Sequence, residues 1–592
     1  MSDRTNQGHR RKRRRKKQIP PVLIVLPMIV VAAIAVAISL YNERYQPTKE
    51  RMELSEVFDV QSGEVALFLD QEEMVELGVS RDGAVYVDQE TAKTYFNDRF
   101  YYNSDGDLRY MMPTEIVKIM PGDTFVTVGG ASTELGHKAF FVEDDTVYLS
   151  LKLLEMFSNW NVDVYDGPSR AFVTTKFDGR QVAVAKKDTQ VRYRGGVKSP
   201  ILVDLAAGEK AYVLADYEDW LEVLYQGVIG YVPTEALDEV QTVDEKTPDR
   251  EPVFSSITHE EDICLGWQQM FYAGGNASLG SFLDAAPGLN VISPTWYSLS
   301  DNEGNFTSLA SADYVAQAHA RGVEVWGLID DFSQEISVYK ILSNCASRTN
   351  LINNLMAAAA EVGLDGINID FENVSADAGE HFVQFFRELS VECRKAGVVL
   401  SVDNFPVSGG RAYVNRKEQG RVLDYVIVMS YDEHYSGGPS AGSTASISYS
   451  KRGMTDMIAA GVPAEKIING VPFYTRVWKE IPEDKAPAGA QILQNPNSAY
   501  GRYALESSAT DMIAAADQLV AQGVTPVWLE EEQQYYGDYE KDGCLVRIWL
   551  EDVRSIEVKM QAIAEQKVAG AAFWKLGLED PAVWNVINNY LN

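Results

Sequence analysis

Residues 365–373 read Asp-Gly-Ile-Asn-Ile-Asp-Phe-Glu-Asn. Because side chains alternate along a β-strand, the apolar and polar residues of this stretch fall on opposite faces. One face holds Ile367, Ile369 and Phe371, and the other holds Asn368, Asp370 and Glu372. A parallel-barrel strand is buried on both faces and is normally apolar throughout, since burying an unpaired polar group is costly. Three successive polar side chains on one face therefore indicate a functional site, with Glu372 at the carboxyl end of the strand, where barrels carry their chemistry.

Apolar runs of strand length recur on both sides of this stretch, and amphipathic helical patterns such as 350–362 and 376–395 separate them. The eight strand candidates are 263–266, 291–294, 323–326, 366–371, 398–402, 425–429, 467–471 and 570–574. Strands that alternate with helices predict a parallel sheet, and eight of them close as a (β/α)8 barrel, here over residues 255–592. The long gap before the last candidate predicts an insertion at about 476–550.

An alternative is that 366–371 is a surface strand with its polar face in water. The uniformly apolar second face and the flanking helical patterns favour the barrel. Two carboxyl groups at alternate positions in a site of low dielectric repel each other when both are ionised. One proton is then retained, so Glu372 can act as a general acid near neutral pH.

The stretch is similar to the DxxDxDxE signature of glycoside hydrolase family 18, the chitinase-type barrels. Three further motifs follow in the same order as in that family. Met429-Ser430-Tyr431-Asp432 resembles the family's MxYD, Gly470-Val471-Pro472-Phe473-Tyr474 resembles its GxPxY, and Trp574 ends the last strand, where the family has an indole under the sugar.

The resemblance implies a retaining glycosidase whose substrate supplies the nucleophile. Glu372 would protonate the glycosidic oxygen while the sugar's 2-acetamido oxygen attacks the anomeric carbon. Asp370 would orient the acetamido N–H, and Tyr431 would bond its oxygen. Supporting roles are expected for Asn368, Asp365, Met429 and Asp432. The substrate would carry N-acetylglucosamine, and no metal or cofactor is expected.

Aromatic side chains offer flat apolar surfaces to sugar rings. The candidates for substrate binding are Trp574, Tyr474, Trp267, Trp296, Trp326 and Arg476. For the aromatic residues other than Trp574, packing in the barrel core is an equally good explanation.

Two departures from the family pattern bear on the substrate. The family's middle Asp is Asn368 here, which can hold Asp370 by a hydrogen bond but cannot share its charge. Phe371 and Asn373-Val374 replace the usual Trp and Tyr-Pro, as in spore-cortex and cell-wall N-acetylglucosaminidases. These substitutions favour peptidoglycan over chitin. A wall-binding or scaffold protein that holds glycan without cutting it is the rival hypothesis, and retention of Glu372 argues against it.

The N-terminus carries eight consecutive basic residues, 10–17, followed by the uncharged apolar stretch 20–41. About 20 apolar residues span a bilayer as a helix, and the basic flank predicts a cytoplasmic tail at 1–19. We therefore expect a type II membrane anchor with the catalytic domain outside the cell. A cleaved signal peptide is the alternative, although its apolar region is normally shorter.

Two small, mostly β modules are predicted before the barrel. Residues 51–179 resemble the small domain found at the N-terminus of copper amine oxidases, with no copper ligands. Residues 180–240 resemble a bacterial Src-homology-3-like domain, through motifs such as Gly230-Tyr231-Val232-Pro233. That family often binds cell-wall peptides, although a spacer role is equally compatible. The charged stretch 241–254 is expected to be a linker.

Composition excludes some classes of partner. The 592 residues contain 53 Lys and Arg against 85 Asp and Glu, for a net charge of −32. Nucleic acid is not expected as a partner, because phosphate binding needs an excess of basic residues. The four cysteines are widely spaced, which predicts buried free thiols and not a disulfide scaffold or a zinc site.

Overall fold

The computed structural model describes residues 21–495 and 498–591. Contacts group the chain into two compact units. The first contains the chain up to Asn97 together with Val142–Glu251, and the second contains Asp98–Phe141 together with Pro252 and the residues after it. The stretch 98–141, which the sequence places in a small upstream module, therefore belongs by its contacts with the C-terminal part of the chain.

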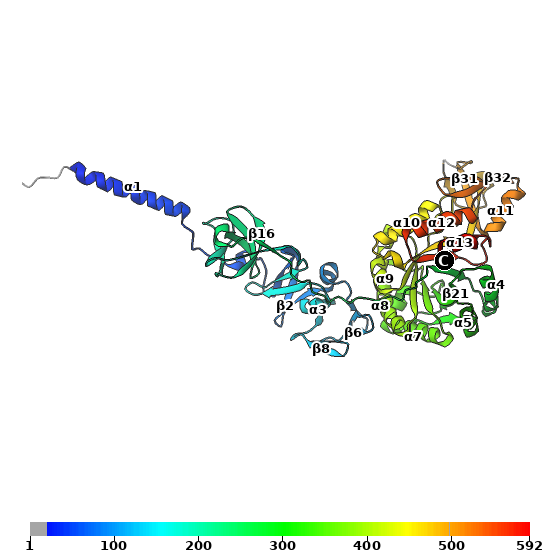
Figure 1. Ribbon diagram of the computed structural model, residues 1–592, viewed down its shortest axis with the longest axis horizontal. Coiled ribbons are helices and arrows are strands. Elements are labelled where there is room, and N and C mark those ends of the chain that lie inside the picture. Colours follow the sequence, from blue (N-terminus) through cyan, green and yellow to red (C-terminus); the bar gives the residue numbers. More distant parts are fainter. Residues whose placement is uncertain (1–20, 496–497, 592) are drawn as a thin grey trace, which may run out of the picture. The chain divides into compact units, whose positions relative to one another are not determined.

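The second unit is built on a closed barrel of eight parallel strands, as predicted (Figure 1). In barrel order the strands are β20 (Ile263–Gln268), β21 (Val291–Leu299), β23 (Glu324–Asp330), β24 (Gly366–Asp370), β25 (Val399–Asn404), β26 (Tyr425–Val428), β27 (Ile467–Pro472) and β34 (Gly570–Trp574). Closure comes from β20, which pairs in parallel with both β21 and β34. A short strand, β22 (Phe306–Ser308), pairs antiparallel with β21 outside the barrel.

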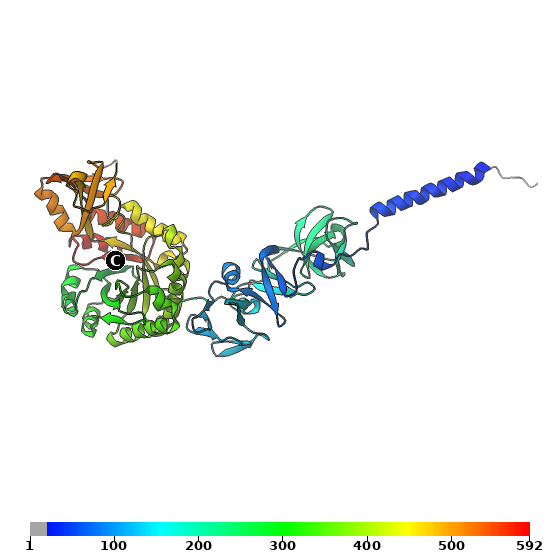
Figure 2. The same cartoon turned by 180° about the vertical axis from the view of Figure 1, so that it is seen from behind.

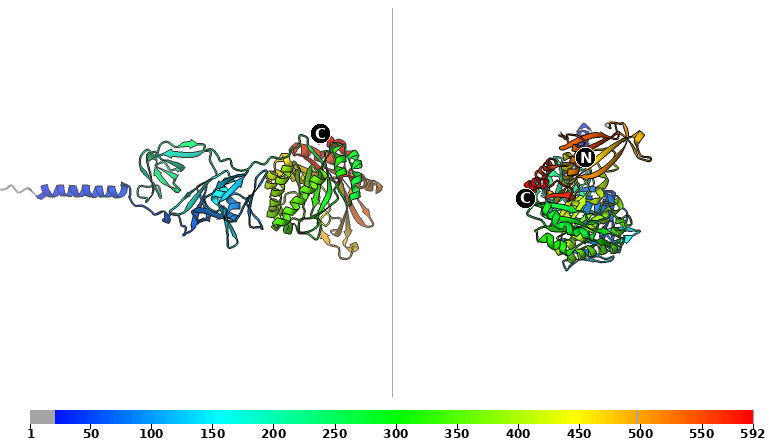
Figure 3. Two further views of the ribbon diagram at one scale, coloured as in Figure 1. Left: turned by 90° about the horizontal axis from the view of Figure 1, so that it is seen from below. Right: turned by 90° about the vertical axis from the view of Figure 1, so that its right-hand side faces the viewer.

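Helices surround the barrel, as Figure 3 shows from two further sides. The two predicted helical patterns correspond to α7 (Cys345–Val362) and α8 (Gly379–Ala396). Each ends at a glycine with positive φ, Gly363 at +76° and Gly397 at +69°, a conformation that glycine adopts without steric cost. The chain can therefore turn sharply into the next strand after each helix.

Strand β24 has the two faces that its sequence predicts. Ile367, Ile369 and Phe371 belong to the apolar layer between the barrel and its helices, where Phe371 stacks on Phe382 and Phe385 of α8. Asn368 and Asp370 lie on the opposite, lumen face. Glu372 follows the last strand residue, at the carboxyl end of the barrel.

The insertion before the last strand is a six-stranded sheet of order β29-β30-β28-β33-β32-β31. Four of these strands are β29 (Ile492–Gln494), β30 (Arg502–Asp511), β31 (Val527–Leu529) and β32 (Gln534–Lys541). The insertion runs from β28 (Tyr474–Pro482) to β33 (Cys544–Leu550), between barrel strands β27 and β34. One helix, α11 (Met512–Ala521), packs on the sheet through the buried Ala515 and Leu519. Figure 2 shows this subdomain in orange above the barrel.

Residues 98–141 contribute a three-stranded sheet of order β4-β5-β6 to the barrel unit. Its strands are β4 (Tyr101–Tyr102), β5 (Leu108–Met111) and β6 (Ile116–Ile119). Two buried arginines of this segment bond carboxylates of the barrel helices, Arg109 to Glu388 and Arg99 to Glu418, each at 3.0 Å. Charged contacts as well as apolar ones therefore hold the segment to the barrel.

The first unit is rich in β-structure, in agreement with the prediction of β modules before the barrel. Residues between 64 and 174 supply strands to a seven-stranded sheet of order β11-β12-β1-β2-β3-β10-β9. The strands are β1 (Glu64–Leu69), β2 (Glu72–Arg81), β3 (Ala84–Asp88), β9 (Phe140–Glu143), β10 (Thr146–Ser150), β11 (Asn161–Tyr165) and β12 (Arg170–Thr174). Residues 180–243 form a second seven-stranded sheet of order β15-β14-β18-β17-β16-β13-β19. The strands are β13 (Arg180–Val184), β14 (Thr189–Arg192), β15 (Ile201–Leu205), β16 (Lys210–Asp216), β17 (Trp220–Tyr225), β18 (Val228–Pro233) and β19 (Gln241–Val243). Val191, Leu221, Val223 and Val232 lie in the buried core of this second sheet.

The first described helix, α1 (Pro21–Tyr45), contains the predicted apolar span. Val22–Tyr45 is long and apolar enough to cross a membrane, with a mean hydropathy of 3.0, and a signal sequence would meet the same criteria. The predicted basic run 10–17 lies outside the described residues.

All four cysteines are free and buried, as expected. Burial raises the pKa of the Cys264 thiol to about 12, so this side chain stays protonated and unreactive near neutral pH.

Candidate active site

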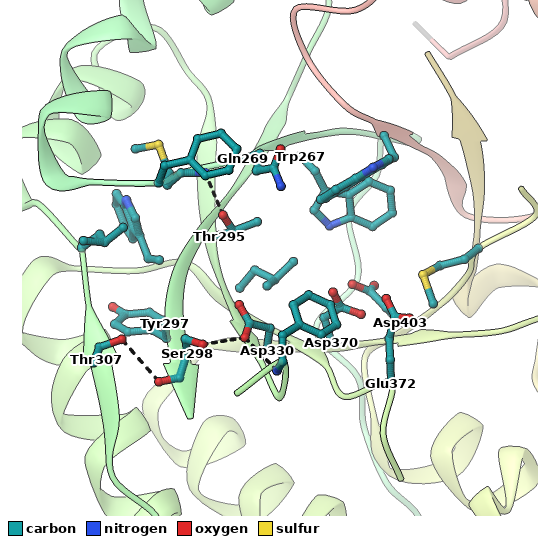
Figure 4. A pocket seen from close by; sticks show the side chains of 18 of the residues that line it. Trp267, Gln269, Thr295, Tyr297, Ser298, Thr307, Asp330, Asp370, Glu372 and Asp403 are labelled. Carbon is teal, nitrogen blue, oxygen red and sulfur yellow. Dashed lines mark hydrogen bonds between the residues drawn. The ribbon is translucent and has the colours of Figure 1, made fainter. Parts of the chain in front are cut away.

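A cavity of about 510 Å³ opens at the carboxyl end of the barrel. Residues at or after the ends of β20, β21, β23, β24, β25, β26 and β34 line it, and Figure 4 shows it from close by. Its lining brings together the predicted Glu372, Asp370 and Tyr431. It also includes three acidic residues that the sequence did not single out as a group, namely Asp330, Asp403 and Asp432, of which only Asp432 was expected in a supporting role.

Glu372 is held in place through its own backbone. The buried Asp331, just after β23, accepts hydrogen bonds from the backbone N–H groups of Glu372 at 3.0 Å and Asn373 at 2.8 Å. The neighbouring strand thus fixes the turn that carries Glu372. Asp331 is a positioning residue that the sequence analysis missed, although the Asp330-Asp331 pair directly after an apolar strand was a usable signal.

The environment of Glu372 favours its protonated form. Burial, followed by the negative charges of Asp331 and Asp432, raises the pKa of Glu372 to about 7, and Arg411 acts in the opposite direction. A carboxylic acid with a pKa near the working pH is well suited to give and take protons. Glu372 can therefore serve as an acid and, after proton transfer, as a base.

Asp370 is buried, with 7% of its surface exposed, and its Oδ1 has no hydrogen-bond partner among the described residues. Burial and the nearby charge of Asp403, with smaller effects of Glu372 and Asp331, raise the pKa of Asp370 well above its ordinary value. The carboxyl groups of Asp370, Glu372 and Asp403 converge in the cavity (Figure 4). An unpaired polar atom directed into a cavity is available to a ligand.

Asn368 does not hold Asp370, so that expectation is wrong. The Asn368 Nδ2 donates to Asp403 Oδ1 at 2.9 Å and to Ser401 Oγ at 3.1 Å. Its Oδ1 accepts from Trp267 Nε1 at 3.0 Å and from Ser293 Oγ at 3.3 Å. The side-chain amide therefore has its partners across the barrel lumen, and Asp370 is left free.

The chain after β26 supplies Met429, Tyr431 and Asp432, all of which line the cavity. Burial raises the pKa of Tyr431 well above its ordinary value, so its hydroxyl remains a hydrogen-bond donor. Asp432 Oδ1 accepts from Tyr474 Oη at 2.6 Å and pairs with Arg476 Nη2 at 3.3 Å. Tyr474 and Arg476 are not among the residues that line the cavity, and their bonds to Asp432 orient that side chain. Their contact with substrate stays a prediction.

The four candidate tryptophans divide into two groups. Trp574, Trp267 and Trp296 line the cavity, and Trp574 meets Trp267 edge to face with ring centroids 5.9 Å apart. Trp326 is fully buried and stacks on Tyr425. The expected substrate contact of Trp326 is therefore wrong, because its ring fills the lumen below the cavity.

Asp365 also lies away from the site. Its Oδ2 bonds His319 Nε2 at 2.7 Å and accepts from the backbone N–H of Val325 at 2.8 Å. Val325 lies at the amino end of β23, and His319 ends the preceding helix α5 (Ala312–His319), on the side of the barrel opposite the cavity. The expected supporting role at the site is wrong for Asp365, whose bonds instead join neighbouring barrel elements.

Further cavity residues were missed by the sequence analysis. Gln269, Phe271 and Phe332 lie on loops after strands, and no periodic pattern predicts loop positions. Asp403 had a signal, since Ser401 and Asp403 alternate with apolar residues in the same way as Asn368 and Asp370. Among residues 21–495 and 498–591, no group of three or more His, Cys, Asp and Glu side chains is placed to hold a metal ion.

Residues 298–579 match the family described as Glycosyl hydrolases family 18. YdhD of Bacillus subtilis (strain 168), provisionally named a sporulation-specific glycosylase, is 31% identical over 329 residues, which cover 53% of this chain and 73% of that protein. The cortical fragment-lytic enzyme of Bacillus anthracis is 24% identical over 255 residues, covering 42% of this chain and 54% of that enzyme.

A solved structure is also similar to this chain. The crystal structure of the Bacillus cereus spore cortex-lytic enzyme SleL is 21% identical in sequence and aligns with a TM-score of 0.48. The alignment covers 62% of this chain and 78% of that chain.

Proposed function

The chain belongs to glycosyl hydrolases family 18 and is a glycosidase, and from this premise we propose that it cleaves N-acetylglucosaminyl linkages in peptidoglycan or a related polymer. The proposed reaction retains the configuration at the anomeric carbon and uses the substrate's own acetamido group as nucleophile. The observation that carries the proposal is the position of Glu372 at the mouth of the barrel, where Asp331 fixes its backbone and burial raises its pKa to about 7.

In the first step, Glu372 gives its proton to the glycosidic oxygen while the acetamido oxygen of the sugar attacks the anomeric carbon. The bond to the leaving sugar breaks, and a cyclic oxazolinium ion forms. Asp370 supports this step, because its free Oδ1 can accept the acetamido N–H and its charge can stabilise the cation. Tyr431, whose hydroxyl stays protonated, donates to the acetamido oxygen.

In the second step, Glu372 is a carboxylate and takes a proton from water, which attacks the same carbon and opens the ring. Glu372 is then protonated again and ready for the next cycle. No step needs a metal ion. Attack from the same face as the departing sugar accounts for retention.

Two features support peptidoglycan over chitin. Phe371 and Asn373-Val374 depart from the usual chitinase residues in the same way as in cell-wall N-acetylglucosaminidases. The names of two relatives, one sporulation-specific and one cortical fragment-lytic, refer to spores and their cortex. Phe371 faces α8 and not the cavity, so this residue indicates ancestry and does not contact substrate.

We also propose that α1 anchors the enzyme in the cell membrane, with the catalytic barrel outside. The length and hydropathy of Val22–Tyr45 support a span, and the basic residues before it support a cytoplasmic N-terminus. The β modules between them would act as a spacer or bind wall peptides. Fractionation of cells, with protease added from outside, tests this topology: the barrel should be cleaved and the tail protected.

The catalytic proposal is tested with the full chain in detergent and purified peptidoglycan, with products identified by mass spectrometry. The wild type should release fragments with N-acetylglucosamine at the new reducing end. Glu372→Gln should lower the rate by about 10²–10⁴-fold. The matched control is Glu557→Gln, which changes an exposed carboxylate on α12 (Val553–Gln566) and should leave the rate unchanged. Binding without turnover by the wild type would contradict the proposal.

A further inference from the structure

Asp370 and Asp403 lie side by side on neighbouring parallel strands. In the pairing of β24 with β25, Asn368 stands opposite Ser401 and Ile369 opposite Val402. The next position on each strand is Asp370 and Asp403, and both side chains face the lumen. Neighbouring strands are about 4.8 Å apart, so the two carboxyl groups enter the same small volume, as Figure 4 shows.

Among residues 21–495 and 498–591, neither carboxyl group has a positively charged partner. Asp403 is 5% exposed and accepts one neutral hydrogen bond, from Asn368 Nδ2. Asp370 is 7% exposed, and its Oδ1 has no hydrogen-bond partner in the part of the chain that the structure describes. The other titratable groups that face this pair are Asp330 and Asp331 at the end of β23, Glu372 on the same turn, and Tyr431 after β26.

The other acidic side chains of the cavity have more hydrogen-bond donors or arginine partners to stabilise their charges than Asp370 and Asp403 have. Asp330 accepts from Ser298 Oγ at 2.7 Å and Asp331 accepts two backbone N–H groups, so both have donors that stabilise a carboxylate. Arg411 acts on Glu372, and Arg476 pairs with Asp432. The pair formed by Asp370 and Asp403 is thus the least compensated acidic pair of the cavity, and ionising both at once is strongly opposed.

We propose that Asp403 is a positioning residue that shares a proton with Asp370 and supplies the carboxylate missing at position 368. In the resting site Asp370 carries the proton, and Asp403 is the anion that accepts from Asn368. When the acetamido group binds, the O–H bond of Asp370 breaks and its electron pair stays on Asp370, while the proton bonds to a carboxylate oxygen of Asp403. Asp370 becomes the anion that faces the cation, and the total charge of the pair does not change.

The catalytic consequence of this proton transfer rests on the proposed function. The sharing of a proton between Asp370 and Asp403 does not depend on it. Burial, with the charge of Glu372 adding to it and the bond from Asn368 opposing it, raises the pKa of Asp403 to about 8. Because the two neighbouring carboxyl groups titrate together, the proton lost in this pH range is the one that the pair shares. A carboxyl whose pKa is raised on folding stabilises the fold below its unfolded pKa, and this stability is lost as pH rises through the folded value. The melting temperature of the wild type should therefore fall as pH rises towards and through about 8.

The experiment uses the full chain in detergent and the variants Asp403→Asn, Asp330→Asn and the exchange variant Asn368→Asp with Asp403→Asn. The first readout is the melting temperature against pH, which needs no substrate. Folding of Asp403→Asn should take up fewer protons than folding of the wild type near pH 7, because Asp370 loses the neighbouring charge that helps to raise its pKa. Asp330→Asn, which removes an acid from the other neighbouring strand, should change this uptake less.

The second readout is the pH dependence of kcat on peptidoglycan. Asp403→Asn should lower kcat by about tenfold or more with little change in KM. The alkaline limb of the pH profile of kcat should move to lower pH in this variant, because the Asp403 charge that helps to raise the pKa of Asp370 is gone. The exchange variant puts a carboxylate back beside Asp370, keeps the acceptor for Trp267 Nε1 and Ser293 Oγ, and should recover most of kcat.

Several outcomes overturn the proposal. It fails if Asp403→Asn keeps the wild-type pH dependence of melting, or if Asp330→Asn shifts the alkaline limb as far. It also fails if the exchange variant folds but stays as inactive as Asp403→Asn. If Asp403→Asn does not fold, the exchange variant alone decides the question, since it must fold and turn over. A wild type that is inactive on every glycan defeats the proposed function only, because the melting comparison still tests the shared proton.

Discussion

Arg109 Nη1 donates to Glu388 Oε1 at 3.0 Å, although 279 residues separate the two side chains. Arg348 of α7 bonds the same carboxylate at 3.1 Å, and all three side chains are buried. Burial alone would raise the pKa of Glu388, but Arg348 and Arg109 hold it below its ordinary value. Asp107 pairs with Arg109 at 3.0 Å and completes a charged cluster between β5 and the barrel helices.

Replacing Arg109 by Ala should destabilise the barrel unit by about 3–5 kcal/mol, because it leaves buried acidic groups with fewer partners. The measurement is the free energy of unfolding in urea. Arg321→Ala is the control, since Arg321 pairs with Asp284 at the surface, where the two side chains are 44% and 73% exposed. A surface pair is worth at most about 1 kcal/mol, so equal effects of the two substitutions would contradict the prediction.

Cutting the chain just before the barrel should also lower the thermal stability of the barrel. A fragment that starts at Pro252 lacks residues 98–141, so Glu388 and Glu418 each lose an arginine partner. We expect this fragment to melt ~5 °C or more below the barrel transition of a fragment that starts at Gln46 and keeps the segment. Equal melting temperatures in scanning calorimetry would show that the segment adds nothing to the stability of the barrel.

Much of the barrel could be predicted from sequence because its signals are local. The alternation of Ile367, Ile369 and Phe371 with polar residues follows from strand geometry alone, and α7 and α8 follow from helical periodicity. Glu372 and Asp370 were predicted for the same reason, since an acid on a buried strand face is conspicuous. Resemblance to a known family added Tyr431, whose own residue type carries no distinguishing signal.

The errors concern relations between distant segments. The partner of Asn368 is Asp403, on the next strand and 35 residues away, and periodicity does not report the register between strands. Trp326 and Trp574 each end a strand predicted from the sequence, but β23 continues to Asp330, so Trp326 lies near its start and below the cavity, whereas Trp574 ends β34 and lines the cavity. The docking of 98–141 on the barrel depends on pairs such as Arg99 with Glu418, 319 residues apart. No local pattern contains such information.

Asp331 should raise the pKa of Glu372 as well as fix the backbone that carries it. Its negative charge raises the pKa of Glu372, so Asp331→Asn should lower that pKa from about 7. The acid form of Glu372 is then lost at lower pH, and the alkaline limb of kcat/KM should move in the acidic direction. The amide also retains only one acceptor atom for the two backbone N–H groups, so kcat should fall by about tenfold. A pH–rate profile with an unshifted limb would contradict the electrostatic part of the prediction.

Replacing Trp574 by Ala should weaken substrate binding, whereas replacing Trp326 by Ala should lower the stability of the fold. Trp574 is half-buried and lines the cavity, so Trp574→Ala should raise KM by about 2–12-fold, the range expected for loss of one aromatic contact, while the melting temperature changes little. Trp326 is fully buried, and its Nε1 donates to Glu324 at 2.9 Å. Trp326→Ala should therefore lower the free energy of unfolding by about 3–5 kcal/mol. Kinetics on chito-oligosaccharides and urea unfolding of the same two proteins separate these effects. A raised KM with normal stability in Trp326→Ala would place its ring in the sugar site, which its position below the cavity does not allow.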